Sequence, residues 1–330
     1  MKAKHAKIWD KSAIDLNVLH GKTIAITGYG SQGRAQALNL RDSGFTPLVG
    51  LKSKSRSRRV AKDDGFEIAT PLNALRKADI VAILVPDHKH QELFSSDFIA
   101  AIKPGQTFVF AHALSVHFKL IVQPADVDFI LAAPHSPGIG LREKYAGGEG
   151  VTAFIGKTDI SSGESLKLAA AYAFAIGCHA GLVETSFADE AVGDIFGEQA
   201  VLCGGLSALL KAGYDTLVKA GIPRENAYLE CVYQIDLIVD LIKKFGINGM
   251  YDRISETAAF GGMDVEPKII NAESRKEMTH ILRDIESGKF TTGLMSDYSK
   301  GFRKFESLKK RGDNLDIDAT LRKLKDKLDL

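Results

Sequence analysis

In the first half of the chain, short apolar runs alternate with amphipathic stretches, a pattern typical of a parallel sheet covered by helices. The apolar runs predict buried strands at 22–27, 46–51, 78–85, 107–112, 129–133 and 151–155. Helices are predicted at 34–40 and 165–176. The alternation of strands and helices predicts an α/β fold with a doubly wound sheet.

In the second half, the strand pattern fades from about Glu184 onward. Long apolar helical stretches follow at 190–220, 224–245 and 273–287. A chain of 330 residues exceeds one average domain, so two are expected. We predict an α/β domain over residues 1–184 and an all-α domain over residues 185–330.

A glycine-rich turn joins the first predicted strand to the first predicted helix, and it reads Gly28-Tyr29-Gly30-Ser31-Gln32-Gly33. Gly28 permits a tight turn, Gly30 lets a pyrophosphate approach the backbone, and Gly33 lets the helix pack on the strand. The N-terminus of the helix would present free N–H groups to the phosphates. A glycine turn without a nucleotide is the alternative, but the flanking strand and helix favour a Rossmann-type dinucleotide site.

The loop after the second strand predicts which nicotinamide cofactor is bound. An NAD site would place an acidic residue there. This chain instead reads Lys52-Ser53-Lys54-Ser55-Arg56-Ser57-Arg58-Arg59. Positive charge and hydroxyl donors suit a 2′-phosphate. We therefore expect NADPH, bound by Lys52, Ser55, Arg56 and Ser57. A solvated basic loop and a nucleic-acid patch are the alternatives, and the position directly after the second strand favours the phosphate.

Further polar residues follow the later strands. Ligands of doubly wound sheets bind at the carboxyl ends of strands. Pro86 and Asp87 follow one such strand, and His112 lies at the end of the next. The loop 134–140, which contains Gly138, is expected beside the same crevice. We therefore expect Pro86, Asp87 and Gly138 to contact the cofactor, together with all six residues of the glycine-rich turn. His112 could instead be a structural histidine at a strand end.

Three carboxylates mark the predicted helical domain. Asp194 and Glu198 are spaced i,i+4, which places them on one face of a helix, and their apolar or small neighbours predict that this face is buried. Glu230 lies in segment 225–242, which is apolar nearly all round. A buried carboxylate is costly unless it is paired or binds a metal, and carboxylate oxygens suit Mg²⁺. A structural salt bridge is the alternative for Glu230.

Composition narrows the class of protein. The formal net charge of +2 argues against nucleic acid as the main partner. Three cysteines without a CxxC spacing argue against a disulfide framework or zinc site and fit a cytoplasmic location. No run of eighteen apolar residues and no signal peptide are apparent, so no membrane association is expected.

These motifs together resemble the short-form (class I) ketol-acid reductoisomerases along nearly the whole chain. Besides the glycine-rich turn, the matching stretches are Ala35–Gly44, Phe110–His112, Phe196–Gly205 and Leu237–Leu241. The resemblance implies an NADPH-dependent Rossmann domain joined to a knotted helical domain that carries two Mg²⁺ ions and mediates dimerisation. It also implies alkyl migration in 2-acetolactate followed by reduction of the resulting 2-keto acid, a step towards valine and isoleucine.

The resemblance also assigns roles to single residues. Asp194 matches the aspartate that bridges both metals, Glu198 the glutamate on the first metal, and Glu230 one glutamate of the second pair. Gln234 stands where the family has the other glutamate, so a second ion is expected to bind more weakly, leaving one or two Mg²⁺ ions. His135 replaces a lysine near the substrate, while Ser255, which would hold the substrate carboxylate, remains.

Three functions are consistent with these residues. The first is an NADPH- and Mg²⁺-dependent ketol-acid reductoisomerase acting on a small keto or ketol acid, with His112, Asp194 and Glu198 in catalysis, as a homodimer or larger homo-oligomer. The second is a divergent family member that only reduces a 2-keto acid or a related carbonyl or imine in a specialised pathway. The third is an NADPH-binding protein without catalysis.

Overall fold

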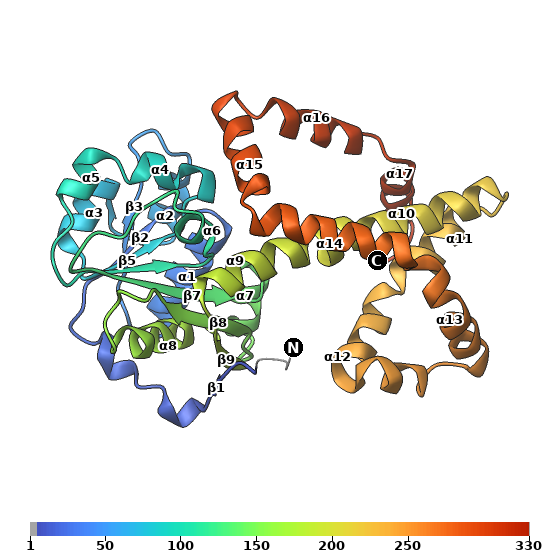
Figure 1. The fold of residues 1–330 in the computed structure, drawn as a ribbon, viewed down its shortest axis with the longest axis horizontal. Helices are drawn as coiled ribbons and strands as arrows, with labels where there is room; N and C mark the ends of the chain where they lie inside the picture. The colour runs from blue at the N-terminus through green and yellow to red at the C-terminus, as the bar shows by residue number, and fades with distance from the viewer. Residues whose placement is uncertain (1–4, 330) are drawn as a thin grey trace. The chain divides into compact units, whose positions relative to one another are not determined.

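The computed structural model describes residues 5–329, so the start of the chain, where no signal peptide is expected, lies partly outside the described residues. The chain divides into two compact units, Met1–Gly193 and Asp194–Leu330. Figure 1 shows strands and helices in the first unit, while the described part of the second unit is helical. The predicted α/β class with a helical C-terminal region is confirmed. The proposed boundary after residue 184 remains a prediction.

The first unit is built on one sheet, which within the described residues has the strand order β1-β9-β8-β7-β6-β5-β2-β3-β4. Neighbouring strands are parallel except in the pairs β1–β9 and β7–β8. The strands are β1 (Ile8–Trp9), β2 (Ile24–Thr27), β3 (Leu48–Gly50), β4 (Ile68–Ala69), β5 (Ile80–Ile83), β6 (Thr107–Phe110), β7 (Asp128–Pro134), β8 (Thr152–Lys157) and β9 (Gly181–Glu184).

The sheet has an apolar cluster on each face, because successive side chains of a strand point to opposite sides. In β5, Ile80 and Ala82 belong to one cluster, while Val81 and Ile83 belong to the other. All four side chains are buried. Burial on both faces explains why the central strands read as continuous apolar runs rather than alternating ones.

Helices cover both faces of this sheet. The cluster that contains Ile80 includes residues of α1 and α8, and the cluster that contains Val81 includes residues of α3 and α5. The helical segments of the first unit are η1 (Lys11–Ala13), η2 (Leu16–Leu19), α1 (Ser31–Asp42), α2 (Ser57–Asp63), α3 (Pro71–Lys77), η3 (Asp87–Lys89), α4 (His90–Leu93), α5 (Ser96–Ala100), α6 (Leu114–His117), α7 (Gly138–Ala146) and α8 (Ser165–Ala175).

Helix α9 (Phe187–Phe196) runs from the first unit into the second. The helical segments that follow are η4 (Gly197–Leu202), α10 (Gly204–Lys219), α11 (Arg224–Tyr228), η5 (Leu229–Tyr233), α12 (Ile235–Tyr251), α13 (Glu256–Ile269), α14 (Ala272–Glu286), α15 (Lys289–Ser299), α16 (Arg303–Gly312) and α17 (Asp316–Lys325). Both η4 and η5 are π-helical turns.

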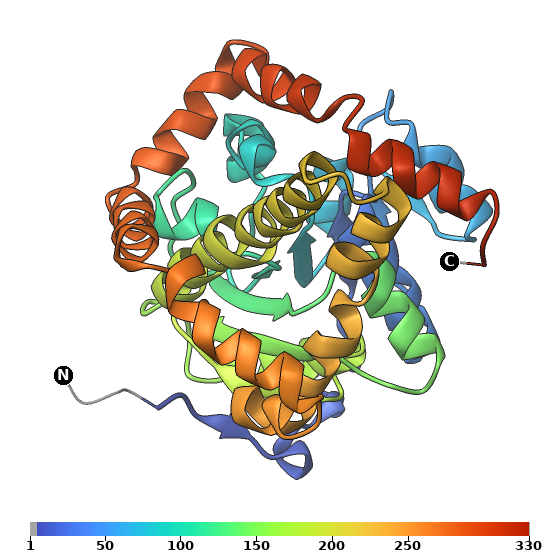
Figure 2. The same cartoon turned by 90° about the vertical axis from the view of Figure 1, so that its right-hand side faces the viewer.

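Within the second unit, α14 to α17 form an open arch that returns to α11 (Figures 1 and 2). Polar contacts close the arch. Asp316 at the start of α17 accepts hydrogen bonds from Tyr214 and Arg224, at 2.7 and 2.8 Å. Lys323 forms an ion pair with Glu225 of α11. A small buried cluster that includes Tyr214, Tyr228 and Leu324 lies beneath these contacts.

The second unit leaves much apolar surface exposed. Segment 225–242 has the composition of a core helix, yet Leu237 is 59% exposed and Val239 is 40% exposed. The expectation that the face carrying Asp194 and Glu198 is buried is also wrong for the single chain, because both residues are exposed. The apolar composition of these helices therefore does not correspond to burial within the described part of one chain.

One helical stretch among the described residues, Phe187–Lys219, is long and apolar enough to cross a membrane by length and composition alone. Of the eighteen residues in its most apolar part, only 6% are buried. The core helices of many proteins pass the same test, so this stretch is weak support for a membrane span.

Candidate active site

A cavity of about 540 Å³ opens at the carboxyl ends of β2, β3, β5 and β6 in the first unit. Its lining includes ten of the thirteen residues predicted to bind the cofactor, and also the predicted catalytic residue His112. Those ten are Gly28, Tyr29, Gly30, Ser31, Gln32, Lys52, Ser55, Ser57, Pro86 and Asp87. The glycine-rich turn and the basic loop, about twenty-five residues apart in sequence, therefore meet at one cavity.

Three predicted cofactor residues do not line this cavity. Gly33 packs inside the turn, and a Cβ there would lie 2.3 Å from the carbonyl oxygen of Gly28. Gly138 lines a second cavity of about 480 Å³ on the other side of the turn. Its N–H donates to Ser31 Oγ at 3.1 Å, and a Cβ on it would meet the Ser31 carbonyl oxygen at 2.2 Å. Arg56 belongs to the basic loop but lines neither cavity.

Glycine stands at positions 28 and 30 of the turn for different structural reasons. Gly28 adopts φ +97°, and a Cβ on it would lie 2.6 Å from the carbonyl oxygen of Leu84, so a larger residue would force the two strand ends apart. A Cβ on Gly30 would meet no protein atom within 4 Å. Gly30 therefore faces open space. The absence of a side chain there leaves room for a ligand rather than for another part of the protein.

His112 lies between two carboxylates at the edge of the cavity. Its Nδ1 is 3.5 Å from Asp87 Oδ2, and its Nε2 is 4.0 Å from Glu190 Oε2. Glu190 is only 3% exposed and accepts the backbone N–H of Ala113 at 2.8 Å. Asp87 of η3 and Glu190 of helix α9 thus flank the imidazole on both sides.

The charges around His112 shift neighbouring pKa values. Burial opposes ionisation of Asp87, but its hydrogen bond to His112 and the charges of His112 and His90 outweigh burial, so the pKa of Asp87 lies below its usual range. Burial is also the main cause that lowers the pKa of His90, which is 2% exposed. His90 Nε2 lies 2.9 Å from the Val85 carbonyl oxygen, so this nitrogen carries the hydrogen.

Sequence reasoning missed Glu190, Lys89 and His90. Lys89 and His90 line the cavity within three residues of Asp87, and this closeness to the strand end is the signal in the sequence that could have identified them. Glu190 lies in an apolar helix one turn before Asp194. A charge at such a position is an indication of function, but only the fold reveals that His112 is its neighbour.

Two of the predicted metal ligands, Glu198 and Glu230, lie in π-helical turns. Asp194 is in the last part of α9, and Glu198 is in η4, whose widened turn joins the Cys203 N–H to the Glu198 carbonyl at 2.8 Å. Gly204 permits this turn, because a Cβ there would lie 2.1 Å from the Gln199 carbonyl oxygen. π-helical turns occur frequently at functional sites.

Glu230 lies in the second π-helical turn, η5, and Gln234 ends it. Gln234 Nε2 donates to Glu230 Oε2 at 3.1 Å and to the Leu229 carbonyl at 3.3 Å. The amide thus points its donor group at the carboxylate, which leaves its oxygen as the only atom that could bind a cation. Both side chains are exposed in the single chain.

Residues 5–329 contain no group of three or more His, Cys, Asp or Glu side chains close enough together to hold a metal ion. The predicted metal ligands are therefore not gathered into one site by a single chain. The two predicted substrate residues lie outside both cavities. Ser255 caps α13 by accepting the Ala258 N–H at 3.2 Å, and His135 Nδ1 lies 2.9 Å from Thr152 Oγ1.

Comparison with known proteins extends this picture. Residues 18–181 match the family model described as the NADPH-binding domain of acetohydroxy acid isomeroreductase. Residues 187–329 match the model for the C-terminal domain of ketol-acid reductoisomerase. A curated ketol-acid reductoisomerase (NADP(+)) from Mycobacterium ulcerans is 42% identical over 313 residues, which cover 94% of each chain.

Solved structures give the same result. An NADH-preferring ketol-acid reductoisomerase from an uncultured archean has a TM-score of 0.93 and 35% identity, covering 98% of this chain and 100% of the other. A semialdehyde dehydrogenase NAD-binding protein from Cupriavidus necator has a TM-score of 0.62 over 81% of this chain and 99% of the other. Its identity is 19%, so this second likeness concerns the fold alone.

The fold and the cavity define a Rossmann-type oxidoreductase with an NADP-binding domain. Within that class, the chain belongs to the ketol-acid reductoisomerase family, as the matches over both halves show. The resemblance seen in the sequence is thereby confirmed. The comparisons give no support to the alternative of a divergent reductase, nor to an NADPH-binding protein without catalysis.

Proposed function

We propose that this protein converts 2-acetolactate-type ketol acids to 2,3-dihydroxy acids by alkyl migration and hydride transfer from NADPH. The observation that carries the proposal is the cavity of about 540 Å³, because it joins the glycine-rich turn, the basic loop and His112. The NADP-dependent relative from Mycobacterium ulcerans supports the same activity.

The residues of the cavity fit NADPH. The open position at Gly30 suits a pyrophosphate, and α1 begins beside it at Ser31 without a side-chain cap. Lys52, Ser55 and Ser57 supply positive charge and hydroxyl donors for the 2′-phosphate. Arg56, Gly33 and Gly138 complete our proposed set, Arg56 through its charge and the two glycines by shaping the turn.

The protein must add a proton as the cofactor supplies hydride to the carbonyl carbon. We assign the proton to His112, which lies at the cavity between Asp87 and Glu190. Asp87 Oδ2 lies 3.5 Å from Nδ1 of the ring, and Glu190 Oε2 lies 4.0 Å from Nε2, so the imidazole has a carboxylate on either side. Proton transfer by a positioned side chain contributes about 10²–10⁴ to rate in enzymes.

We also propose one or two Mg²⁺ ions, with Asp194 and Glu198 as ligands and Glu230 as a third. Since these groups do not gather in one chain, we propose that Glu230 comes from a second copy. Gln234 contributes no negative charge, which weakens any second ion. Ser255 and His135 are proposed substrate contacts.

We also propose a homodimer or larger homo-oligomer, and the exposed apolar surface of the second unit supports this proposal. Leu237, Phe260 and Leu202 are more than half exposed, at 59%, 79% and 65%. Monomeric proteins rarely expose apolar side chains of this size in such number on one set of helices.

The free cysteines Cys178, Cys203 and Cys231 fit a reducing cytoplasm.

Replacing His112 tests the proposed proton donor. We expect His112→Asn to lower kcat by about 100-fold or more, because the side chain can no longer transfer a proton, while the KM for NADPH changes little. The measurement is NADPH oxidation under saturating substrate. His117→Asn, which removes an imidazole that lines neither cavity, is the control. Full activity in His112→Asn would contradict the assignment.

A further inference from the structure

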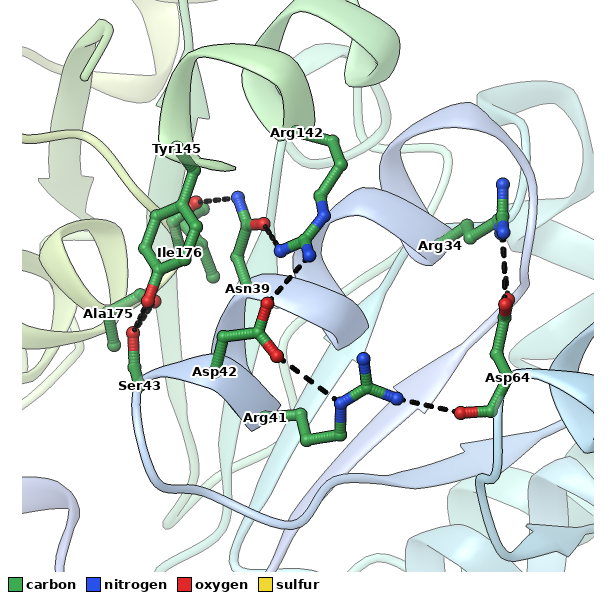
Figure 3. Close-up of polar contacts among 10 residues, drawn as sticks. All are labelled: Arg34, Asn39, Arg41, Asp42, Ser43, Asp64, Arg142, Tyr145, Ala175 and Ile176. Carbon is green, nitrogen blue, oxygen red and sulfur yellow. Dashed lines mark hydrogen bonds and ion pairs between the residues drawn. The ribbon is translucent and has the colours of Figure 1, made fainter. Parts of the chain in front are cut away.

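Asp64, at the end of α2, connects the basic loop with the glycine-rich turn. Arg34 binds its carboxylate with two hydrogen bonds, from Nε to Oδ2 at 2.7 Å and from Nη2 to Oδ1 at 2.9 Å. Tyr29 Oη donates to Oδ2 at 2.8 Å. Figure 3 shows Arg34 and Arg41 reaching Asp64 from α1, where Arg41 Nη1 donates to the Asp64 carbonyl oxygen at 2.7 Å.

The hydrogen bonds between Arg34 and Asp64 are charge-assisted, which makes them stronger than bonds between neutral groups. A bidentate pair between a guanidinium and a carboxylate fixes orientation as well as distance. The hydrogen bonds from Arg34 are the main cause that holds the pKa of Asp64 below its usual range, so the carboxylate is charged at neutral pH. The Asp64 side chain is only 16% exposed, and the ring of Tyr29 packs edge-on against Phe66 at 5.9 Å.

The basic loop has two fixed ends, and Asp64 fixes one of them. At the first end, Leu51 donates its N–H to the Ala69 carbonyl at 2.9 Å, and Arg58 Nη1 donates to the Leu51 carbonyl at 3.0 Å. At the other end, the loop runs into α2, which ends at Asp63 and is followed by Asp64 as its C-terminal cap residue. The orientation of α2, and with it the positions of Ser55 and Ser57, therefore depends on where Asp64 is held.

Tyr29 links Asp64 directly to the cofactor cavity. It is the second residue of the glycine-rich turn, it lines the cavity, and it is 5% exposed. Its hydroxyl contacts Asp64, while its backbone belongs to the proposed pyrophosphate site. The Asp64 carboxylate thus links the two halves of the proposed phosphate-binding surface, in addition to the hydrogen bond from the Gly28 N–H to the Gly50 carbonyl at 3.2 Å.

We propose that Asp64 is a positioning residue for cofactor selectivity, which sets the basic loop at the distance that a 2′-phosphate requires. Asp64 does not line the cavity, so its effect acts through α2 and Tyr29. The inference rests on the proposed NADPH site. It predicts a selective effect, because NADH has no 2′-phosphate and depends little on the placement of this loop.

The direction in which the NADPH affinity changes distinguishes a positioning role of Asp64 from a purely electrostatic one. Removal of a negative charge close to a phosphate site should strengthen phosphate binding by Coulomb attraction alone. A positioning role predicts the opposite, because the loop loses its anchor. Asp63 offers a matched control, since it is the neighbouring carboxylate at the same helix end and pairs with the exposed Arg59 at 3.7 Å.

The experiment is calorimetric titration of the full-length protein with NADPH and with NADH, for wild type, Asp64→Asn and Asp63→Asn. We expect Asp64→Asn to raise the Kd for NADPH about tenfold, with less than a twofold change for NADH. Asp63→Asn should bind both cofactors as the wild type does, or NADPH slightly more tightly. Tyr29→Phe, which removes only one donor to Asp64, should give a smaller loss in the same direction.

The alternative outcomes separate the two proposals. If wild type prefers NADPH and Asp64→Asn keeps that preference, the positioning role is wrong while the NADPH site stands. An equal loss for both cofactors, with a lowered melting temperature, would mean that Asp64 is only structural. If wild type binds both cofactors equally, the basic loop is not a 2′-phosphate site and both proposals fall. Should Asp64→Asn not fold, the same comparison in Tyr29→Phe decides.

Discussion

Single residues decide the chemistry of the cavity, and the ionisable ones depend on neighbours that the sequence does not reveal. His112 and Asp87 could be predicted because each follows a strand in an α/β pattern. Their partner Glu190 could not, because it comes from a helix about eighty residues away. The proposed metal ligands differ from these residues. Their positions were inferred from spacing and resemblance, but the described part of one chain does not gather them into one site.

His90 predicts a pH dependence of stability. Burial lowers its pKa in the folded state, so the unfolded chain binds the proton more tightly. The stability contribution of neutral His90 is therefore complete above the ordinary histidine value of about 6.5, and it is lost as the pH falls through the lower folded-state pKa.

The variant His90→Gln tests this dependence. A glutamine amide can still donate to the Val85 carbonyl but does not titrate between pH 5 and 8. Wild type should lose more free energy of unfolding than His90→Gln when the pH falls from 7.5 to 5.5, as measured by urea unfolding. Parallel curves for the two proteins would show that His90 is not the group responsible.

At the scale of elements, the sequence predicted what depends on local pattern. Strands β2, β3, β5, β6, β7 and β8 each correspond to a predicted apolar run. Strands β1 and β4 have two residues each, which is too short for a recognisable period, and β9 was also missed. The π-helical turns η4 and η5 could not be predicted, because their residues also suit an ordinary α-helix.

Two glycines of the same turn should respond differently to one added methyl group. Gly33→Ala places a Cβ against the Gly28 carbonyl, so we expect a loss of about 1–3 kcal/mol in unfolding free energy together with weaker NADPH binding. Gly30→Ala meets no protein atom within 4 Å, so the stability of the free protein should be nearly unchanged while NADPH binding weakens.

Thermal melts of the two variants with and without NADPH provide the measurement. The free Gly30→Ala protein should melt as the wild type does, but NADPH should raise its melting temperature by less. If NADPH stabilises Gly30→Ala as strongly as wild type, then the pyrophosphate does not approach the turn at Gly30.

At the scale of the whole molecule, the helical unit buries little apolar surface within a single chain. Its buried cluster is small, while apolar side chains remain exposed along α12 and α13. The sequence predicted the helices and, through the resemblance, a dimer. It could not show which residues need a second copy, because apolar composition does not distinguish a core within one chain from one between two.

Mixed dimers test whether the proposed metal ligands come from two chains. Asp194→Ala and Glu230→Ala should each be inactive alone. If each site uses Asp194 of one chain and Glu230 of its partner, a mixed dimer retains one intact site of two. Random mixing makes half of the dimers mixed, so refolding equal amounts together should restore about a quarter of wild-type activity. No recovery would place both ligands in the same chain.

The central claim is that this chain performs both alkyl migration and reduction, despite Gln234 and His135 at positions where the sequence resemblance implies a glutamate and a lysine. The most direct measurement is NADPH oxidation, followed by absorbance with Mg²⁺ present, comparing 2-acetolactate with 3-hydroxy-3-methyl-2-oxobutyrate, the already rearranged keto acid. We predict turnover of both substrates. Turnover of the rearranged acid alone would contradict the claim, because it would mean that the protein reduces a keto acid but no longer isomerises a ketol acid.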